Sequence, residues 1–189
     1  NIETALLNGF GEAYGLEFSV SKVKGRLLGT ANYTYARSLR KVSGARPSER
    51  INNGNFYPTN YDQPNIVNVN WRYGISRRIF FSGNFTYHTG RPVSLPESAY
   101  SIDRVSVQNF SERNRYRIPD YHRMDVALIV EGNHKLKKFW DGTWVFSFYN
   151  AYARKNAYSV FFQDDGRGKL IPYKLAVIET VIPSLGYSF

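Results

Sequence analysis

The chain has 189 residues, about the length of one domain, and carries 25 Lys and Arg against 15 Asp and Glu, a formal net charge of +10. It contains no Cys, which excludes disulfide scaffolds, Cys-based zinc sites and thiol nucleophiles. No apolar run approaches the roughly 18 residues of a membrane-spanning helix, so a helical membrane protein is excluded. Aromatic residues make up 16% of the chain and are interleaved with polar residues.

Apolar and polar residues alternate with a period of two in segments of roughly ten residues, which is typical of β-strands. In the first segment, Tyr14, Leu16, Phe18 and Val20 project to one face, with small or polar residues on the other. The alternation predicts seven strands, at residues 12–22, 27–37, 63–73, 78–89, 121–131, 143–162 and 170–189. We expect the sixth to be one long or bent strand, and the seventh to be interrupted or bulged at Pro183.

The connections between these strands are short at one end and long at the other. Tight turns at 23–26 and 74–77 contrast with long loops at 38–62 and 90–120, which contain many Ser, Asn, Pro, Gly and Arg residues. The strands are about as long as a bilayer crossing, and rings recur near their ends. This combination favours an antiparallel transmembrane β-barrel over a water-soluble sandwich.

Seven strands leave two open edges, whereas bacterial single-chain barrels have even numbers of strands. One resolution is an eighth strand at residues 2–7, turning at Asn8-Gly9, which closes a small eight-stranded barrel. The other is that residues 1–11 are the tail of an extracellular loop, and that residues 1–189 form the C-terminal part of a larger barrel with long extracellular loops at 38–62 and 90–120.

Several ordered motifs resemble the C-terminal barrel region of TonB-dependent outer-membrane receptors of the Bacteroidota type. They are GEAYGLE at 11–17, INNG at 51–54, YDQP at 61–64, YHTGRPV at 87–93 and RIPDYHRMD at 117–125. The stretch YNAYARKNAYS at 149–159 is similar to the family's penultimate-strand motif, and IPSLGYSF at 182–189 is similar to its terminal strand. The resemblance extends from about residue 11 to residue 189.

The resemblance implies an all-β, 22-stranded transmembrane barrel with an N-terminal plug, of which this chain holds about the last seven strands and not the plug. It implies a multi-pass protein of the cell outer membrane with a periplasmic C-terminus, where Phe189 is similar to the terminal aromatic read by the barrel-assembly machinery. The expected function is TonB-dependent active transport of a scarce solute such as a ferric siderophore, glycan or peptide. Such a receptor is not an enzyme, because transport is conformational.

The expected partners are the remainder of the barrel and the plug, the TonB system acting through the N-terminal part, lipopolysaccharide and outer-membrane lipid, and surface lipoprotein or other complex partners. The alternative is a structural or scaffold barrel subunit of a larger outer-membrane complex. Nucleic acid is not an expected partner, because the rings follow the strand alternation while basic residues lie in turns and loops. Rings and charges therefore do not form one stacking groove.

A transport receptor needs a polar inner wall and outer loops that contact the solute. By alternation, the wall contains Glu17, Thr30, Asn32, Asn68, Asn70, Arg72, Asn84, Thr86, His88, Arg123 and Asp125. The candidate ligand-binding residues, in this wall or in the outer loops, are His88, Arg91, Arg113, Arg115, Arg117, Arg123 and Asp125. The structural alternative is that wall residues bond each other or the plug, and that loop charges hold lipopolysaccharide.

No catalytic group, metal or cofactor is expected. His122 and Asp125 are three residues apart, so in a strand their side chains project to opposite faces. Strict alternation also places His88 and His122 on different faces of neighbouring strands. These residue types therefore do not converge on one metal site, and no Ser, His and acid converge on a hydrolytic one.

Overall fold

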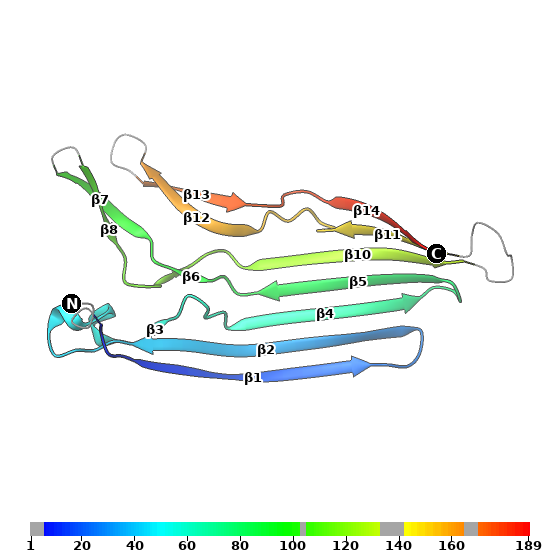
Figure 1. Cartoon of the computed structure of the whole chain (residues 1–189), viewed down its shortest axis with the longest axis horizontal. Coiled ribbons are helices and arrows are strands. Elements are labelled where there is room, and N and C mark those ends of the chain that lie inside the picture. Colours follow the sequence, from blue (N-terminus) through cyan, green and yellow to red (C-terminus); the bar gives the residue numbers. More distant parts are fainter. Residues whose placement is uncertain (1–5, 103–104, 133–141, 165–169) are drawn as a thin grey trace.

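The computed structural model describes residues 6–102, 105–132, 142–164 and 170–189, and most of its strand residues belong to one antiparallel sheet. Its strands are β1 (Phe10–Lys22), β2 (Leu27–Lys41), β4 (Asn65–Gly74), β5 (Ile79–His88), β10 (Tyr121–Glu131), β11 (Thr143–Tyr149) and β14 (Ile182–Ser188). They lie side by side in that order, with the short strand β3 (Tyr57–Pro58) added to β2 (Figure 1). The prediction of an all-β antiparallel fold is confirmed.

The sheet has two unlike ends, as the loop lengths predict. The turns at 23–26 and 75–78 lie at one end, which we call the turn end, and the chain also finishes there after β14 (Figure 1). At the other end, the loop end, the described parts of residues 42–64, 89–120 and 150–181 form what we call the loop layer. Two hairpins extend from the loop end, β7 (Pro96–Ile102) with β8 (Val105–Phe110), and β12 (Ala157–Asp164) with β13 (Leu170–Ala176).

The strand register sorts the side chains onto two faces, because directly paired residues of neighbouring strands share a face. One paired row runs Phe18, Tyr33, Val67, Tyr87 and His122, and the next row on the same face runs Val20, Ala31, Val69, Phe85 and Met124. Trp144, Phe146, Phe148 and Leu185 continue this apolar face across β11 and β14. The opposite, mainly polar face carries Ser, Thr, Asn and charged residues, with an apolar row of Phe80, Ile129 and Val145 toward the turn end.

Neither face of the sheet is covered by another layer within the described part of the chain. Leu16, Phe18 and Val20 on the apolar face are more than half exposed. Among the described residues, the buried apolar side chains are Tyr57, Ile118 and Ala157, all of them in or bordering the loop layer. Within the described ranges no second sheet packs on the apolar face, so these residues do not form a two-sheet sandwich.

The sheet does not close on itself. Among the described residues, β1 pairs only with β2, and β14 pairs only with β11. The proposed eighth strand at 2–7 lies mostly outside the described residues; of its members, Leu6 and Leu7 are described, and neither is in a strand. No helix in the described ranges is long and apolar enough to cross a membrane.

The last two predicted strands are each divided, which corrects the expectation of one long strand at 143–162. Asn150 and Ala153 have positive φ angles, 54° and 52°, which end β11 before the chain enters β12. On the return, residues 177–181 separate β13 from β14, so the interruption precedes Pro183. Pro183 itself lies within β14, opposite Phe148, where an edge strand tolerates a residue without an N–H.

The two long predicted loops contain short regular elements. Residues 38–62 hold the end of β2, the 3-10 turns η2 (Pro47–Glu49) and η3 (Asn52–Gly54), and β3. Residues 90–120 hold the β7–β8 hairpin and the small pair β6 (Pro92–Val93) with β9 (Tyr116–Arg117). Residues 1–11, expected to be a loop tail, include the start of β1 at Phe10.

Candidate functional site

The predicted polar wall exists as one face of the sheet. One paired row runs Ser19, Asn32, Asn68, Thr86 and Arg123, and the adjacent row runs Ser21, Thr30, Asn70, Asn84 and Asp125. Glu17, His88 and Arg72 fall on the same face, so all eleven predicted wall residues share it. His122 pairs with Tyr87 and His88 with Tyr121, which confirms that the two histidines lie on opposite faces.

Arg123 is the best-anchored charge of this wall. Its Nε and Nη2 lie 3.0 and 2.9 Å from Oδ2 of Asp125, and its Nη1 donates to the hydroxyls of Tyr121 and Tyr149. The guanidinium also lies 4.0 Å from the centre of the Tyr149 ring. Oδ1 of Asp125 accepts a hydrogen bond of 2.9 Å from the Asn150 N–H. Arg123 and Asp125 therefore neutralise each other and position Tyr121, Tyr149 and Asn150.

His88 forms a flat aromatic surface at the loop end of the wall. Its ring stacks on Tyr121 with centroids 4.7 Å apart and an angle of 1° between the planes. Nδ1 of His88 lies 2.9 Å from Nε2 of Gln63, which fixes the orientation of the imidazole. The stacked pair therefore presents a flat ring surface on the polar face, at the loop end of β5 and β10.

A hollow of about 480 Å³ opens beside this ring pair. It is lined on the wall side by His88, Tyr121, Arg123 and Tyr149, and on the loop side by Arg91, Ile118, Asn150, Asn156, Ala157, Tyr158, Val177 and Ile178. Nη2 of Arg91 donates to the Tyr158 carbonyl at 2.8 Å, and its guanidinium lies 5.7 Å from the Tyr158 ring centre. The structure thus brings together three predicted candidates: His88, Arg91 and Arg123.

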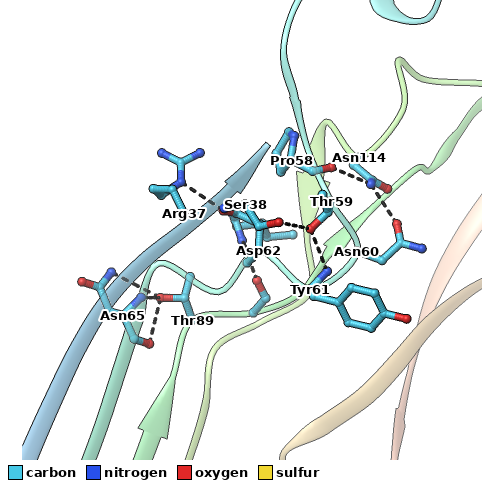
Figure 2. Close-up of polar contacts among 12 residues, drawn as sticks. Arg37, Ser38, Pro58, Thr59, Asn60, Tyr61, Asp62, Asn65, Thr89 and Asn114 are labelled. Carbon is cyan, nitrogen blue, oxygen red and sulfur yellow. Dashed lines mark hydrogen bonds and ion pairs between the residues drawn. The ribbon is translucent and has the colours of Figure 1, made fainter. Parts of the chain in front are cut away.

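Arg117, a fourth candidate, is held by a carboxylate instead of facing this hollow. Its Nη2 contacts Oδ2 of Asp62, while its Nη1 donates to the carbonyls of Asp62 and Gly90. Nε of Arg37 lies 3.1 Å from Oδ1 of Asp62, and the Ser38 N–H donates to the same oxygen at 2.7 Å (Figure 2). Asp62 is only 1% exposed. It therefore joins β2 to both long loops.

Asp62 is ionised under ordinary conditions. Burial opposes its ionisation, but the hydrogen bond from the Ser38 N–H and the guanidinium groups of Arg117 and Arg37 outweigh burial, so the pKa of Asp62 lies below its ordinary value. Asp120 behaves similarly: hydrogen bonds from the Gly90 N–H and the Tyr87 hydroxyl lower the pKa of its carboxyl group. Both carboxylates hold the loop layer onto the sheet.

Asn114 links the two long loops at a second place. Its Nδ2 donates to the Pro58 carbonyl at 2.7 Å and to Oδ1 of Asn60 at 2.8 Å, as Figure 2 shows, and its N–H donates to Ser94. The nearby amide of Asn52 pairs with the backbone of Arg113, donating at 2.8 Å and accepting at 2.7 Å. The loops therefore form one connected body.

The remaining candidates lie away from the hollow of 480 Å³. Arg113 borders a second hollow, of about 380 Å³, whereas Arg115 is exposed with its guanidinium 6.0 Å from the Tyr116 ring centre. Gly90 lies where the two ends of the 89–120 loop pass close to each other: a Cβ there would stand 1.7 Å from the Ile118 carbonyl oxygen. In the part of the chain that is described, no group of three His, Asp or Glu is placed to hold a metal ion.

Sequence reasoning missed Asp62, Asn114, Asn150, Tyr149 and Tyr158. Asn114 and Asn150 have positive φ angles, a conformation that Asn tolerates better than most residues. The signal available in the sequence was therefore the residue type, which is compatible with a tight turn at each position. Asp62 gave no local signal, because its partners lie 25 and 55 residues away.

Comparison with protein families, characterised proteins and solved structures finds no match to this chain.

Proposed function

We propose that the chain is the C-terminal part of the β-barrel of an outer-membrane active-transport receptor of the TonB-dependent type, which takes up a scarce solute. The observation that carries this proposal is the sheet with one continuous apolar face and one mainly polar face, neither covered by another described layer. Lipid on one side and a water-filled lumen on the other satisfy both faces at once.

The exposed apolar side chains argue for a nonaqueous cover on that face. Fully burying one Leu, Val or Phe side chain contributes about 1.5–3 kcal/mol relative to leaving it in water. The apolar face contributes such side chains from all seven long strands, so the gain on covering it is large. A face of this extent calls for lipid or a large protein surface.

Strand length favours lipid as the cover. The ten residues of β4 and of β5 span about 33 Å at about 3.3 Å per residue. Tilted by about 40°, such strands cover the apolar band of about 25 Å found in outer-membrane barrels. The open edges at β1 and β14 support a barrel completed by further strands, since unpaired backbone groups in lipid cost several kcal/mol each.

Membrane topology can be tested by single-Cys labelling, because the chain has no Cys of its own. Three variants place the thiol in the loop layer, at the turn end and on the apolar face: Ser48→Cys, Arg77→Cys and Phe81→Cys. A membrane-impermeant maleimide should label the first in intact cells and the second only after the outer membrane is opened. It should not label the third. Equal labelling of all three, or recovery in the soluble fraction, contradicts the proposal.

The intact mass of the native protein separates the receptor from its alternative. An antibody against residues 38–62 should recover from outer membranes a protein several times heavier than 21.8 kDa. A mass near 21.8 kDa would instead favour a split subunit or scaffold barrel of a larger complex. Dependence of solute accumulation on the TonB system then distinguishes transport from a scaffold role in the same membrane.

A further inference from the structure

We propose that two adjoining hollows of the loop layer form one binding site for an anionic solute that carries an aromatic or other flat apolar group. The inference rests on the proposed function and names the class of solute that the receptor would capture. The first hollow, of about 480 Å³, is the one beside His88 and Tyr121; the second, of about 380 Å³, is lined by Arg113, Asn114, Asn60 and residues 91–94, among others. Arg91 and Ile118 line both hollows.

The charges of this site are unbalanced. Arg123 and Arg117 are neutralised by Asp125 and Asp62, as described above. In contrast, no carboxylate among the described residues lies within ion-pair distance of Arg91 or Arg113, and no Asp or Glu lines either hollow. Arg91 uses one nitrogen on the Tyr158 carbonyl, and its other donors can reach a ligand. An anion would supply the missing negative charge.

The guanidinium group suits a particular kind of anion. Its planar fork of N–H donors matches the two oxygens of a carboxylate or a phosphate, and such charge-assisted pairs are stronger than neutral hydrogen bonds. Arg91 is an exposed residue and therefore is not already desolvated before a ligand arrives. Arg113, exposed on the second hollow, can hold a second anionic group of the same ligand.

Rings supply the apolar part of the site. Tyr121, Tyr149 and Tyr158 line the first hollow with the His88 imidazole, and Ala157, Val177 and Ile178 add aliphatic surface. The His88–Tyr121 pair is already stacked, with parallel planes, and so keeps its orientation without cost on binding. An aromatic ring stacked or placed edge-on against such a group gains about 0.5–1.5 kcal/mol beyond its buried area.

The test uses the native protein extracted in detergent and three small probes compared by calorimetry. N-acetylphenylalanine carries a ring and a carboxylate, N-acetylphenylalaninamide carries the ring without the charge, and acetate carries the charge without the ring. The acid should bind at least tenfold more tightly than either of the other two. Equal binding of acid and amide, or no binding of any probe up to tens of millimolar, overturns the inference.

Two substitutions locate the site. Arg91→Gln should lower the affinity for the acid to that for the amide and leave the amide unchanged, and Arg91→Lys should keep part of the difference. The matched control is Arg77→Gln, which removes the same charge at the turn end and should leave all three affinities unchanged. If Arg91→Gln has no more effect than Arg77→Gln, the site assignment is wrong. Because Cys labelling reports topology independently, a failure of this binding test leaves the membrane proposal standing, and the two failures are distinguishable.

Discussion

The sheet and the loop layer are held together in different ways. In the sheet, many similar residues repeat along regular strands. Side-chain bonds such as Ser19–Asn32 join adjacent strands, while the Arg72–Glu131 ion pair reaches from β4 past β5 to β10. In the loop layer, a few buried polar residues each join several segments: Asp62 joins β2 to both long loops, and Asn150 bonds residues 125, 154 and 180. We therefore expect the sheet to tolerate most changes that respect its faces, and the loop layer to be sensitive at single positions.

The largest expected effect comes from placing a charge on the apolar face. Phe85 pairs with Val69 and Met124 near the middle of the sheet. With the apolar face in lipid, as proposed above, Phe85→Arg should lower the free energy of unfolding by about 2–4 kcal/mol, the cost of an arginine near the midplane of a bilayer. Denaturant unfolding from lipid vesicles, or the yield of folded protein in the outer membrane, measures this change.

The control for Phe85→Arg is its neighbour on the opposite face. Asn84 pairs with Asn70 of β4 on one side and with Asp125 of β10 on the other. Asn84→Arg therefore introduces the same side chain into a polar environment. We expect its stability to remain within about 0.5 kcal/mol of the unsubstituted protein. Equal losses in both variants would mean that the two faces do not have different surroundings.

Removing the charge of Asp62 should have the next largest effect. Asp62→Asn leaves Arg37 and Arg117 without a counterion. We expect a loss of about 2–3 kcal/mol in the local stability of the loop layer, less than for a fully buried pair because both arginine side chains are more than a quarter exposed. Limited proteolysis and hydrogen exchange of residues 42–64 measure it.

Glu49→Gln is the matched control for Asp62→Asn. Oε1 of Glu49 lies 4.0 Å from Nε of Arg46, and the two residues form an exposed i,i+3 ion pair in the same loop. Such surface pairs contribute about 0–1 kcal/mol, so protease resistance should hardly change. If the two variants are cleaved at the same rate, Asp62 does not have the joining role assigned to it.

Two substitutions at Asn114 distinguish the contribution of its side-chain hydrogen bonds from that of its backbone conformation. Its φ is 58°, which glycine adopts freely, so Asn114→Gly removes the bonds to Pro58 and Asn60 while keeping the turn accessible. We expect a local loss of about 1–2 kcal/mol. Asn114→Ala should lose about 1 kcal/mol more, because its Cβ disfavours the left-handed region. Hydrogen exchange of residues 57–62 gives both values, and equal effects would mean that φ does not matter there.

Lowering the pH should destabilise the loop layer before it destabilises the sheet. This is the smallest of the predicted effects. The folded pKa of Asp62 is below its ordinary value, so its ionised form stabilises the fold above about pH 4, and this stability is lost as the pH falls through the folded pKa. At pH 4 the loss is at most about 0.4 kcal/mol, since about half of the unfolded chains are then protonated at this residue. Proteolysis between pH 7 and pH 4 should therefore increase slightly in the unsubstituted protein and less in Asp62→Asn, in which Asp120 still contributes.

Most of the sheet could be predicted from the sequence, because a strand repeats every two residues and its pattern is local. The first five predicted strands agree with the structure to within a few residues, and the wall residues share one face. The prediction was wrong where alternation continued through a change of direction. Residues 143–162 alternate through Asn150 and Ala153, whose positive φ angles divide the segment into β11 and β12.

The candidate site was predicted only in part. His88, Arg91 and Arg123 meet because each stands in or next to a strand whose register places it at the loop end. Arg117 was expected to meet the solute, but it is bonded to Asp62, a partner 55 residues away that no local pattern indicates. Pro92 and Pro96 made residues 90–120 resemble a plain loop, which hid the β7–β8 hairpin.

The order of the strands has a consequence for how the chain reaches its fold. After every excursion into the loop layer, the chain returns to the position beside the strand it has just left, from β1 through to β14. Each new strand therefore closes a loop no longer than the excursion that precedes it, and loop-closure entropy grows only slowly with loop length. The described sheet can therefore grow by adding each strand beside the one before it, and β1 and β14 stand at its two edges.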